Sequence, residues 1–257
     1  MKRERAYVEG RRQQVLDMLQ RNPQIRIDEL AKRLGVSVVT IRRDLQFLEE
    51  KRQITRFYGG ARVSKEADGF LDDVTIYRDL IARHAAQLVE DGDTIFINTS
   101  QNALDMMKYI ESRHVTVITN NGRAINQEKA DGVALILTGG EVRHPKEALV
   151  GDFATRNLQN IFAKKAFMGC AGISAMAGMS TEIANEVNVN QLMIEHTAPQ
   201  SVYLLADHTK IGHNSSFTSC GIEMVKHLIT DEMAPEEELE QMRMQGVKIY
   251  QVRRSDY

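Results

Sequence analysis

Residues 37–45 read Ser-Val-Val-Thr-Ile-Arg-Arg-Asp-Leu, and these side chains suit the chemistry of a DNA major groove. An arginine there can pair with guanine through two hydrogen bonds, and Thr or Val can contact a thymine methyl group. At 100° per residue, Ile41, Leu45 and Leu48 fall on one helix face, which would pack on a core. The predicted DNA contacts lie on or beside the opposite face, and on this helix they are Ser37, Val38, Val39, Thr40, Arg42, Arg43 and Gln46.

Two short helices and a hairpin must position that face. A helix-like stretch at 27–34 is followed by a Gly-Val-Ser break, and Ser37 is suited to cap the second helix. This is the helix-turn-helix pattern. Residues 55–63 then read Thr-Arg-Phe-Tyr-Gly-Gly-Ala-Arg-Val, and two β-prone arms around Gly-Gly predict a hairpin. The result is a winged helix, and its hairpin adds Arg56, Tyr58 and Arg62 to the predicted DNA contacts.

The charge is divided unequally along the chain. Residues 1–65 hold 16 Lys and Arg against 8 Asp and Glu, whereas residues 66–257 hold 17 against 27. A basic part beside an acidic one suggests a polyanionic partner for the basic part, and this supports binding to double-stranded operator DNA. The alternatives are a solvated amphipathic helix, or a helix-turn-helix in an RNA-binding or protein–protein module. The acidic part is not expected to bind nucleic acid by itself.

Length and composition limit the class of protein. The 257 residues are 42% hydrophobic and 26% charged, which fits one large or two unequal globular domains. No apolar run approaches the ~18–20 residues that cross a membrane, and no signal peptide is evident at the N-terminus. Cys170 and Cys220 are too few for a disulfide framework or a zinc site. We expect a cytoplasmic protein with no membrane partner, no metal and no cofactor.

A polar stretch without periodicity at 64–69 predicts the boundary between domains. We predict a winged helix-turn-helix domain at 1–65, a linker at 66–74 and an α/β domain at 75–257. In the α/β domain, apolar spacing between Leu80 and Leu88 predicts a first helix, after which strands and helices alternate. The predicted strands are 94–97, 115–119, 134–137, 165–168, 202–206, 227–230 and 247–252, and the predicted helices are 102–112, 122–130, 150–161, 185–196 and 235–245. This alternation implies a mainly parallel sheet.

Polar residues follow the predicted strands. In open α/β sheets, ligands bind beyond the carboxyl ends of the strands. The side chains and glycines there suit a phosphate and several hydroxyl groups, so we expect a sugar phosphate as effector. The predicted contacts are Thr99, Ser100, Gln101, Asn120, Gly139, Gly140, Gly169 and Lys210. The alternative is that these residues serve only as caps and turns.

The whole chain resembles the DeoR (deoxyribose-operon repressor) family of bacterial transcription regulators. In the first part, the resemblance rests on Ser-x-x-Thr-Ile-Arg-Arg-Asp-Leu at 37–45 and Arg-x-Tyr-Gly-Gly-Ala at 56–61. In the second part, it rests on Asp-Gly-Asp-Thr-Ile at 91–95, Thr-Asn at 119–120, Gly-Gly at 139–140, Leu-Val-Gly at 149–151, Ala-Phe-Met-Gly at 166–169, Leu-Ala-Asp-His-Thr-Lys at 205–210 and Leu-Ile-Thr-Asp at 228–231.

The resemblance implies a winged-helix DNA reader joined to a sensor related in fold to ribose-5-phosphate isomerase and glucosamine-6-phosphate deaminase. It implies that the sensor binds a phosphorylated sugar and that the protein represses genes for uptake or catabolism of that sugar. Release of the DNA on ligand binding is the family's usual behaviour.

Three stretches depart from the family pattern. Where the family often has Asp-x-Gly-Thr-Thr, residues 98–102 read Asn-Thr-Ser-Gln-Asn. Gly-x-Asp-Gly-Ile becomes Gly-Cys-Ala-Gly-Ile at 169–173, so that an acidic group is missing. Thr-Thr-x-Asn-Glu becomes Ser-Thr-Glu-Ile-Ala at 180–184, with Asn185-Glu186 displaced by two positions. These changes bear on the identity of the ligand, and Thr181 is retained among the predicted effector contacts.

The alternative function is a sugar-phosphate isomerase or deaminase with a DNA-binding appendage. Proton transfer in such an enzyme needs a carboxylate or a histidine as base. The candidates near strand ends are Glu141, Glu182, Glu186, Asp207, His208 and His213. None of them forms a recognisable pair at a diagnostic spacing, so no catalytic residue is predicted. We predict a regulator rather than an enzyme, acting as a homodimer or homotetramer because helix-turn-helix readers usually pair.

Overall fold

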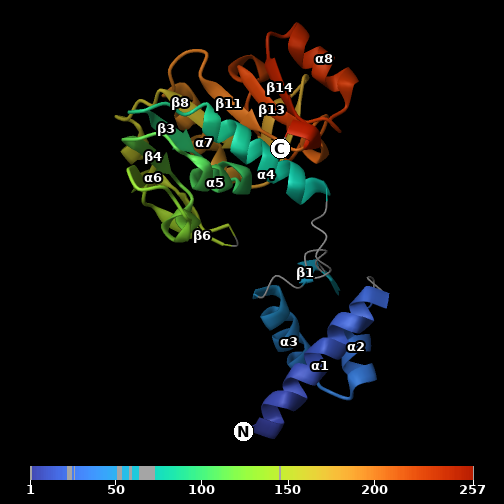
Figure 1. Cartoon of the computed structure of the whole chain (residues 1–257). Helices are drawn as coiled ribbons and strands as arrows, with labels where there is room; N and C mark the ends of the chain where they lie inside the picture. The colour runs from blue at the N-terminus through green and yellow to red at the C-terminus, as the bar shows by residue number, and fades with distance from the viewer. Residues whose placement is uncertain are drawn as a thin grey trace. The chain divides into compact units, whose positions relative to one another are not determined.

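The computed structural model describes residues 2–21, 25, 27–50, 54–57, 60–63, 73–144 and 146–256. The chain divides into two compact units, Met1–Asp73 and Val74–Tyr257. Figure 1 shows the first unit in blue and the second from teal to red. Among the helices of the described residues, none is both long and apolar enough to cross a membrane.

The first unit is a three-helix bundle followed by a hairpin. Helices α1 (Lys2–Arg21), α2 (Ile27–Leu34) and α3 (Val38–Glu50) precede strands β1 (Ile54–Phe57) and β2 (Gly60–Val63). The strands pair antiparallel. The core is formed by apolar residues of the three helices, by Ile25 between α1 and α2, and by the start of β1: Val15, Leu16, Leu19, Ile25, Leu30, Ala31, Ile41, Leu45, Leu48 and Ile54. The predicted helix-turn-helix and hairpin are confirmed.

A seven-stranded parallel sheet forms the centre of the second unit. Its strands are β3 (Thr94–Ile97), β4 (Val115–Thr119), β5 (Val133–Leu137), β8 (Lys165–Gly169), β11 (Val202–Leu205), β13 (His227–Asp231) and β14 (Lys248–Val252). The strand order is β14-β13-β11-β8-β3-β4-β5, and every neighbouring pair is parallel. All seven predicted strands are present. The order reverses between β3 and β8, which are neighbours in space but not in sequence.

Helices cover both faces of this sheet. Successive strand residues point to opposite faces, so Ile95 and Ile97 pack on one side and Phe96 on the other. Helices α4 (Asp73–Gln87) and α5 (Gln101–Asp105) share the core of the first side. Helices α6 (Asp152–Leu158), α7 (Ala184–Glu195) and α8 (Glu236–Met244) share the core of the other. The helices and sheet thus form three layers (Figure 1).

Two parts of this unit differ from the prediction. The helix predicted at 122–130 is wrong, because only a short 3₁₀ turn, η3 (Gly122–Asn126), forms there. Ile125 is 67% exposed, so the stretch has no apolar stripe to bury. Short antiparallel strands were not predicted: β6 (Glu141–Arg143) pairs with β7 (Ala148–Val150), and β10 (Gly178–Thr181) lies between β9 (Gly172–Ser174) and β12 (Phe217–Cys220).

Candidate functional site

The predicted DNA-contacting face lies on α3. Its N-cap is Ser37, whose hydroxyl oxygen accepts the backbone N–H of Thr40 at 3.1 Å and lies 2.8 Å from the Thr40 hydroxyl. Ile41, Leu45 and Leu48 are buried, as the helical spacing predicts. On the other side of the helix, Thr40 is half-buried, and the exposed residues are Ser37, Val38, Val39, Arg42, Arg43 and Gln46. The structure therefore brings these seven predicted contacts together at the N-terminal end of α3 and along its exposed side.

A buried acid fixes α3 against α1. Asp44 is only 2% exposed, and its carboxylate accepts hydrogen bonds from Arg11 Nε at 2.6 Å and Arg12 Nε at 3.1 Å. The Arg12 guanidinium also stacks 3.5 Å from the centroid of the Phe47 ring. Sequence reasoning placed Asp44 in the motif but assigned it no contact. The available signal was its position three residues after Ile41, on the buried side of the helix, where an acid needs a cationic partner.

Two of the remaining predicted DNA contacts, Arg56 and Arg62, belong to the strands of the hairpin. Arg56 lies opposite Ala61, and Thr55 lies opposite Arg62. The side chains of Arg56 and Arg62, and the whole of Tyr58, lie outside the described residues.

The second unit contains a polar cavity of about 330 Å³ at the carboxyl ends of β3 and β8. These are the strands between which the sheet order reverses, and this is the usual ligand position in open α/β sheets. The lining residues are Arg78, Asn98, Thr99, Ser100, Gln101, Asn102, Arg123, Lys146, Gly169, Cys170, Ala171, Thr181, Glu182, Glu186, Asn190, Leu205, Ala206, Asp207 and Lys210. Amides, hydroxyls and charged groups therefore dominate its wall.

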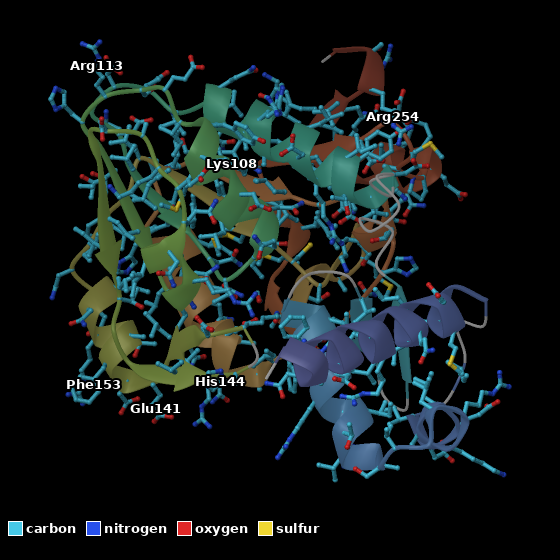
Figure 2. All side chains as sticks on the ribbon, turned by 60° about the horizontal axis from the view of Figure 1, so that its bottom comes forward. Lys108, Arg113, Glu141, His144, Phe153 and Arg254 are labelled. Carbon is cyan, nitrogen blue, oxygen red and sulfur yellow. The ribbon has the colours of Figure 1, made fainter. Side chains whose placement is uncertain are left out.

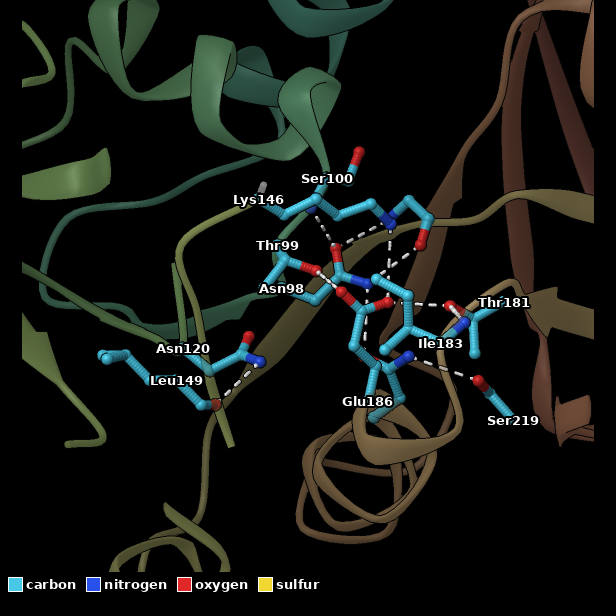
Figure 3. A network of polar contacts seen from close by, with 12 residues as sticks. Asn98, Thr99, Ser100, Asn120, Lys146, Leu149, Thr181, Ile183, Glu186 and Ser219 are labelled. Carbon is cyan, nitrogen blue, oxygen red and sulfur yellow. Dashed lines mark hydrogen bonds and ion pairs between the residues drawn. The ribbon is translucent and has the colours of Figure 1, made fainter. Parts of the chain in front are cut away.

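Asn98 joins the two strand ends at the base of the cavity (Figure 3). Its Oδ1 accepts the backbone N–H groups of Gly169 at 3.0 Å and Ser100 at 3.2 Å, and its Nδ2 donates to the Gly169 carbonyl at 2.8 Å. Gly169 must be a glycine here, since an added Cβ would lie 1.9 Å from the Ser100 hydroxyl oxygen. The close approach of the loops after β3 and β8 depends on this pair.

Glu186 brings a carboxylate into the cavity wall from α7. It is 2% exposed and accepts hydrogen bonds from the hydroxyls of Thr99 at 2.9 Å and Thr181 at 2.7 Å. Lys146, on the connection between β6 and β7, lies 3.5 Å from the same carboxylate (Figure 3). The sequence suggested Glu186 only as a candidate base. Its hydrogen bond with Thr99 was not predicted, because the two residues lie 87 positions apart in the sequence.

A second carboxylate, Asp207, lies at the end of β11 and is 1% exposed. Arg78 of α4 donates from Nε to its Oδ2 at 2.7 Å, and Thr209 donates its backbone N–H to Oδ1 at 3.0 Å. Burial raises the pKa of Asp207, but the hydrogen bonds from Thr209 and the charge of Arg78 outweigh burial and hold that pKa below its ordinary value. Asp207 is therefore ionised at neutral pH.

The structure gathers six of the nine predicted effector contacts in the cavity wall: Thr99, Ser100, Gln101, Gly169, Thr181 and Lys210. Asn120, Gly139 and Gly140 do not line it, because the β6–β7 hairpin and α6 cover the ends of β4 and β5. Asn120 donates from Nδ2 to the Leu149 carbonyl at 3.3 Å. An added Cβ on Gly140 would lie 2.5 Å from the Val150 carbonyl oxygen, so this glycine permits close packing.

Arg78, Arg123, Lys146 and Asn190 were missed as lining residues. They come from α4, η3, the β6–β7 connection and α7, rather than from strand ends. Cys170 also lines the cavity, and burial raises the pKa of its thiol to about 12. The thiol is therefore protonated at neutral pH and is a poor nucleophile.

Two family models match the chain, and between them they span both units. A DeoR-like helix-turn-helix domain matches residues 11–67, and a DeoR C terminal sensor domain matches residues 74–232. The chain belongs to the DeoR family. It is a DNA-binding transcriptional regulator, as predicted from the residues of α3 and the hairpin.

Relatives of this DeoR-family regulator match over most of their length. It is 32% identical to the HTH-type transcriptional regulator GolR of Listeria innocua, over 86% of this chain and 89% of that one. It is 28% identical to the lactose phosphotransferase system repressor of Staphylococcus epidermidis, over 85% of this chain and 90% of that one. These names describe regulators, in agreement with the prediction of a regulator rather than an enzyme.

Among solved structures, the chain is similar to ribose 5-phosphate isomerase A of Methanocaldococcus jannaschii. The match covers 52% of this chain and 52% of the isomerase chain. The identity is 15% and the TM-score 0.36.

Proposed function

We propose that this DeoR-family regulator represses genes for the uptake or catabolism of a sugar, and that a phosphorylated form of the sugar binds the cavity and weakens operator binding. The name of the Staphylococcus epidermidis relative, a repressor of a lactose phosphotransferase system, supports a sugar as the signal. The observation that carries the proposal is the chemistry of the cavity wall.

The wall combines cations with hydroxyl and amide groups. Two of its acids already have donors, since Asp207 pairs with Arg78 and Glu186 accepts from two threonines. Lys210 has no carboxylate within ion-pair distance among the described residues, so its ammonium is available to a phosphate. Hydroxyl and amide groups of Ser100, Gln101 and Asn102 lie in the same wall and suit sugar hydroxyls. Among the described lining residues none is aromatic, which disfavours a nucleobase or an apolar ligand.

The proposed regulator acts as a homo-oligomer. In a helix-turn-helix dimer, the two reading helices lie about 34 Å apart or at multiples of that distance, which matches one turn of DNA. Large apolar side chains on the second unit support self-association, since Phe153 is 74% exposed and Phe162 is 73% exposed. Sedimentation velocity would measure the assembly, and a monomer bound to operator DNA would contradict this part of the proposal.

The experiment is a fluorescence anisotropy titration with DNA from the region upstream of the gene for this chain. The titration would be run without added sugar phosphate, and then with ribose 5-phosphate, glucose 6-phosphate, galactose 6-phosphate or glucosamine 6-phosphate. Specific binding that one compound weakens is the expected result. Specific binding that is indifferent to every compound would contradict a phosphosugar effector. Turnover of one of the compounds, measured in a separate aldose–ketose conversion assay, would favour the isomerase alternative.

Lys210→Ala tests where the effector binds. A hydrogen bond to a charged group contributes about 1.5–3 kcal/mol, so calorimetry should show the affinity for the active compound falling by roughly 10- to 100-fold. Lys248→Ala is the matched control, because Lys248 is exposed at the start of β14, away from the carboxyl ends of the strands. An unchanged dissociation constant for Lys210→Ala would place the effector elsewhere.

A further inference from the structure

Side chains that face the cavity also hold the beginning of α4. Arg78 Nε donates to Asp207 at 2.7 Å, and both residues line the cavity. One residue earlier, the Tyr77 hydroxyl donates to Glu232 at 3.0 Å, and its ring meets the His208 ring edge-on at 5.9 Å. Arg254 lies over the Tyr77 ring, with its guanidinium carbon 5.4 Å from the centroid. The Arg78–Asp207 pair thus belongs both to the cavity wall and to the contacts that hold the start of α4.

The segment that receives Arg78 is itself firmly held. His208 donates its backbone N–H to Asp231 at 2.8 Å, and its Nδ1 lies 2.9 Å from the other oxygen of that carboxylate. Asp231 is fully buried on β13. Thr209 adds a backbone hydrogen bond to Asp207. Because residues 207–209 are fixed to the sheet, the flexible member of the ion pair is Arg78, whose side chain is 39% exposed.

A phosphate in the cavity would face both members of this pair. It carries a charge of about −1.5 to −2 at neutral pH and binds arginine through two parallel hydrogen bonds. The Asp207 carboxylate repels it, whereas the Arg78 guanidinium attracts it. Lys210, three residues after Asp207, supplies a second cation in the same wall.

We propose that the phosphate of the effector competes with Asp207 for Arg78, and that this exchange of partners transmits effector binding to the start of α4. The inference rests on the proposed function, because it assumes that a phosphorylated ligand occupies the cavity. Helix α4 begins at Asp73, the last residue of the first unit, so its opening turns follow the DNA-binding part along the chain. Loss of the Asp207 contact removes a polar tie between these turns and the cavity wall, which changes how firmly the start of the helix is held.

The rest of α4 has independent anchors. Leu80, Ile81 and Ala85 are buried in the core beside the sheet. Asp79 accepts a hydrogen bond from the Tyr109 hydroxyl and pairs with Arg83 at 2.8 Å and Lys108 at 3.1 Å; Lys108 is labelled in Figure 2. Arg83 therefore provides a matched control: it is an arginine of the same helix, paired with an aspartate, but it lies outside the cavity wall.

The test measures the effector and DNA affinities of Arg78→Gln and Asp207→Asn, with Arg83→Gln as control. The probe is the sugar phosphate that weakens DNA binding of the unaltered protein. Competition predicts opposite effects on its affinity: Arg78→Gln removes an attracting group, and Asp207→Asn removes a repelling competitor. We expect shifts of about tenfold in each direction by calorimetry, which corresponds to about 1.4 kcal/mol.

Coupling is the second readout. Effectors typically change the affinity for a second ligand by 5- to 150-fold, and anisotropy with saturating sugar phosphate gives this factor directly. In both cavity variants, the factor should fall to about 1, and in Arg83→Gln it should equal that of the unaltered protein.

Weaker effector binding in both Arg78→Gln and Asp207→Asn would overturn the inference, because it indicates a merely structural ion pair. So would a coupling factor in Arg78→Gln that equals that of the unaltered protein. A loss of coupling in Arg83→Gln as large as in the cavity variants would overturn it as well. If the unaltered protein responds to no sugar phosphate, it is instead the proposed function that fails. Melting curves of each variant separate these results from misfolding.

Discussion

Arg42 and Arg43 are adjacent in sequence but leave α3 in directions 100° apart. Ile41, Leu45 and Leu48 fix the buried side of the helix, and Arg43 is the arginine that lies nearly opposite to it. Arg42 lies on the flank of the exposed face. A side chain at the centre of such a face reaches base edges in the groove, whereas a flanking one meets the phosphate backbone.

Arg43→Ala should therefore cost about 1–3 kcal/mol of operator binding and relax specificity at one position of the DNA. Arg42→Ala is the comparison, with an expected loss that is similar for operator and random DNA. Anisotropy titrations with both DNAs, at one fixed salt concentration, measure the two ratios. If Arg43→Ala weakens operator and random DNA equally, Arg43 contacts only phosphate.

At the scale of elements, α3 is held in place by its own acid. Asp44 is buried between Arg11 and Arg12 of α1, so it orients the exposed face without touching DNA. Asp44→Asn keeps the shape of the side chain but removes the charge that both guanidiniums share. Because hydrogen bonds to charged groups contribute about 1.5–3 kcal/mol, we expect a loss of that size in the stability of the first unit.

Thermal denaturation followed by circular dichroism measures this loss, with Asp28→Asn on the exposed surface of α2 as control. DNA binding should weaken by the same factor on operator and random sequences, because Asp44 positions the helix rather than reading a base. Unchanged stability would show that the packing of Ile41, Leu45 and Leu48 is sufficient to hold α3.

The elements also show what could be predicted from the sequence. The sheet strands were predictable because each holds a short cluster of apolar or β-branched residues between polar turns. Strands of three residues, such as β6 and β9, carry too little periodicity to be recognised. In the cavity, residues at strand ends could be predicted from strand positions alone. Arg78, Arg123 and Lys146 reach the wall from other elements, and their places depend on tertiary packing.

In the whole molecule, the two units carry opposite charge and different pH sensitivity. Residues 1–65, with 16 basic and 8 acidic side chains, suit a polyanion, whereas the net negative charge of the remainder disfavours contact with nucleic acid. The second unit also contains two histidines, His84 and His227, whose charged form is disfavoured by burial. Burial lowers the pKa of His84 below its ordinary value of 6.5, and the pKa of His227 is lowered mainly by the same cause.

The sign of the pH effect follows from these pKa values. Among the described residues, the buried Nε2 of His84 has no hydrogen-bond partner, and its ring lies 5.5 Å from that of Tyr250. The folded unit keeps His84 neutral below pH 6.5, whereas the unfolded chain takes up the proton there. Stability should therefore fall as the pH drops from about 6.5 toward the lower folded pKa, by at most about 1.4 kcal/mol per pH unit for each histidine. The carboxylates with lowered pKa, Asp79, Asp93 and Asp207, lose their contribution only in a more acidic range, below about pH 4.

His84→Phe keeps an aromatic ring against Tyr250 and removes the titration. We expect the melting temperature of the second unit to fall between pH 7.5 and pH 5.5 in the unaltered protein, and to fall less in this variant. Differential scanning calorimetry at both pH values measures the difference, with exposed His213→Gln as control. An equal fall in all three proteins would assign the acid sensitivity to other groups. A smaller fall in His84→Phe alone would show that one half-buried histidine makes the sensor less stable in mild acid, while Asp207 in the cavity wall, whose pKa is lowered, remains ionised.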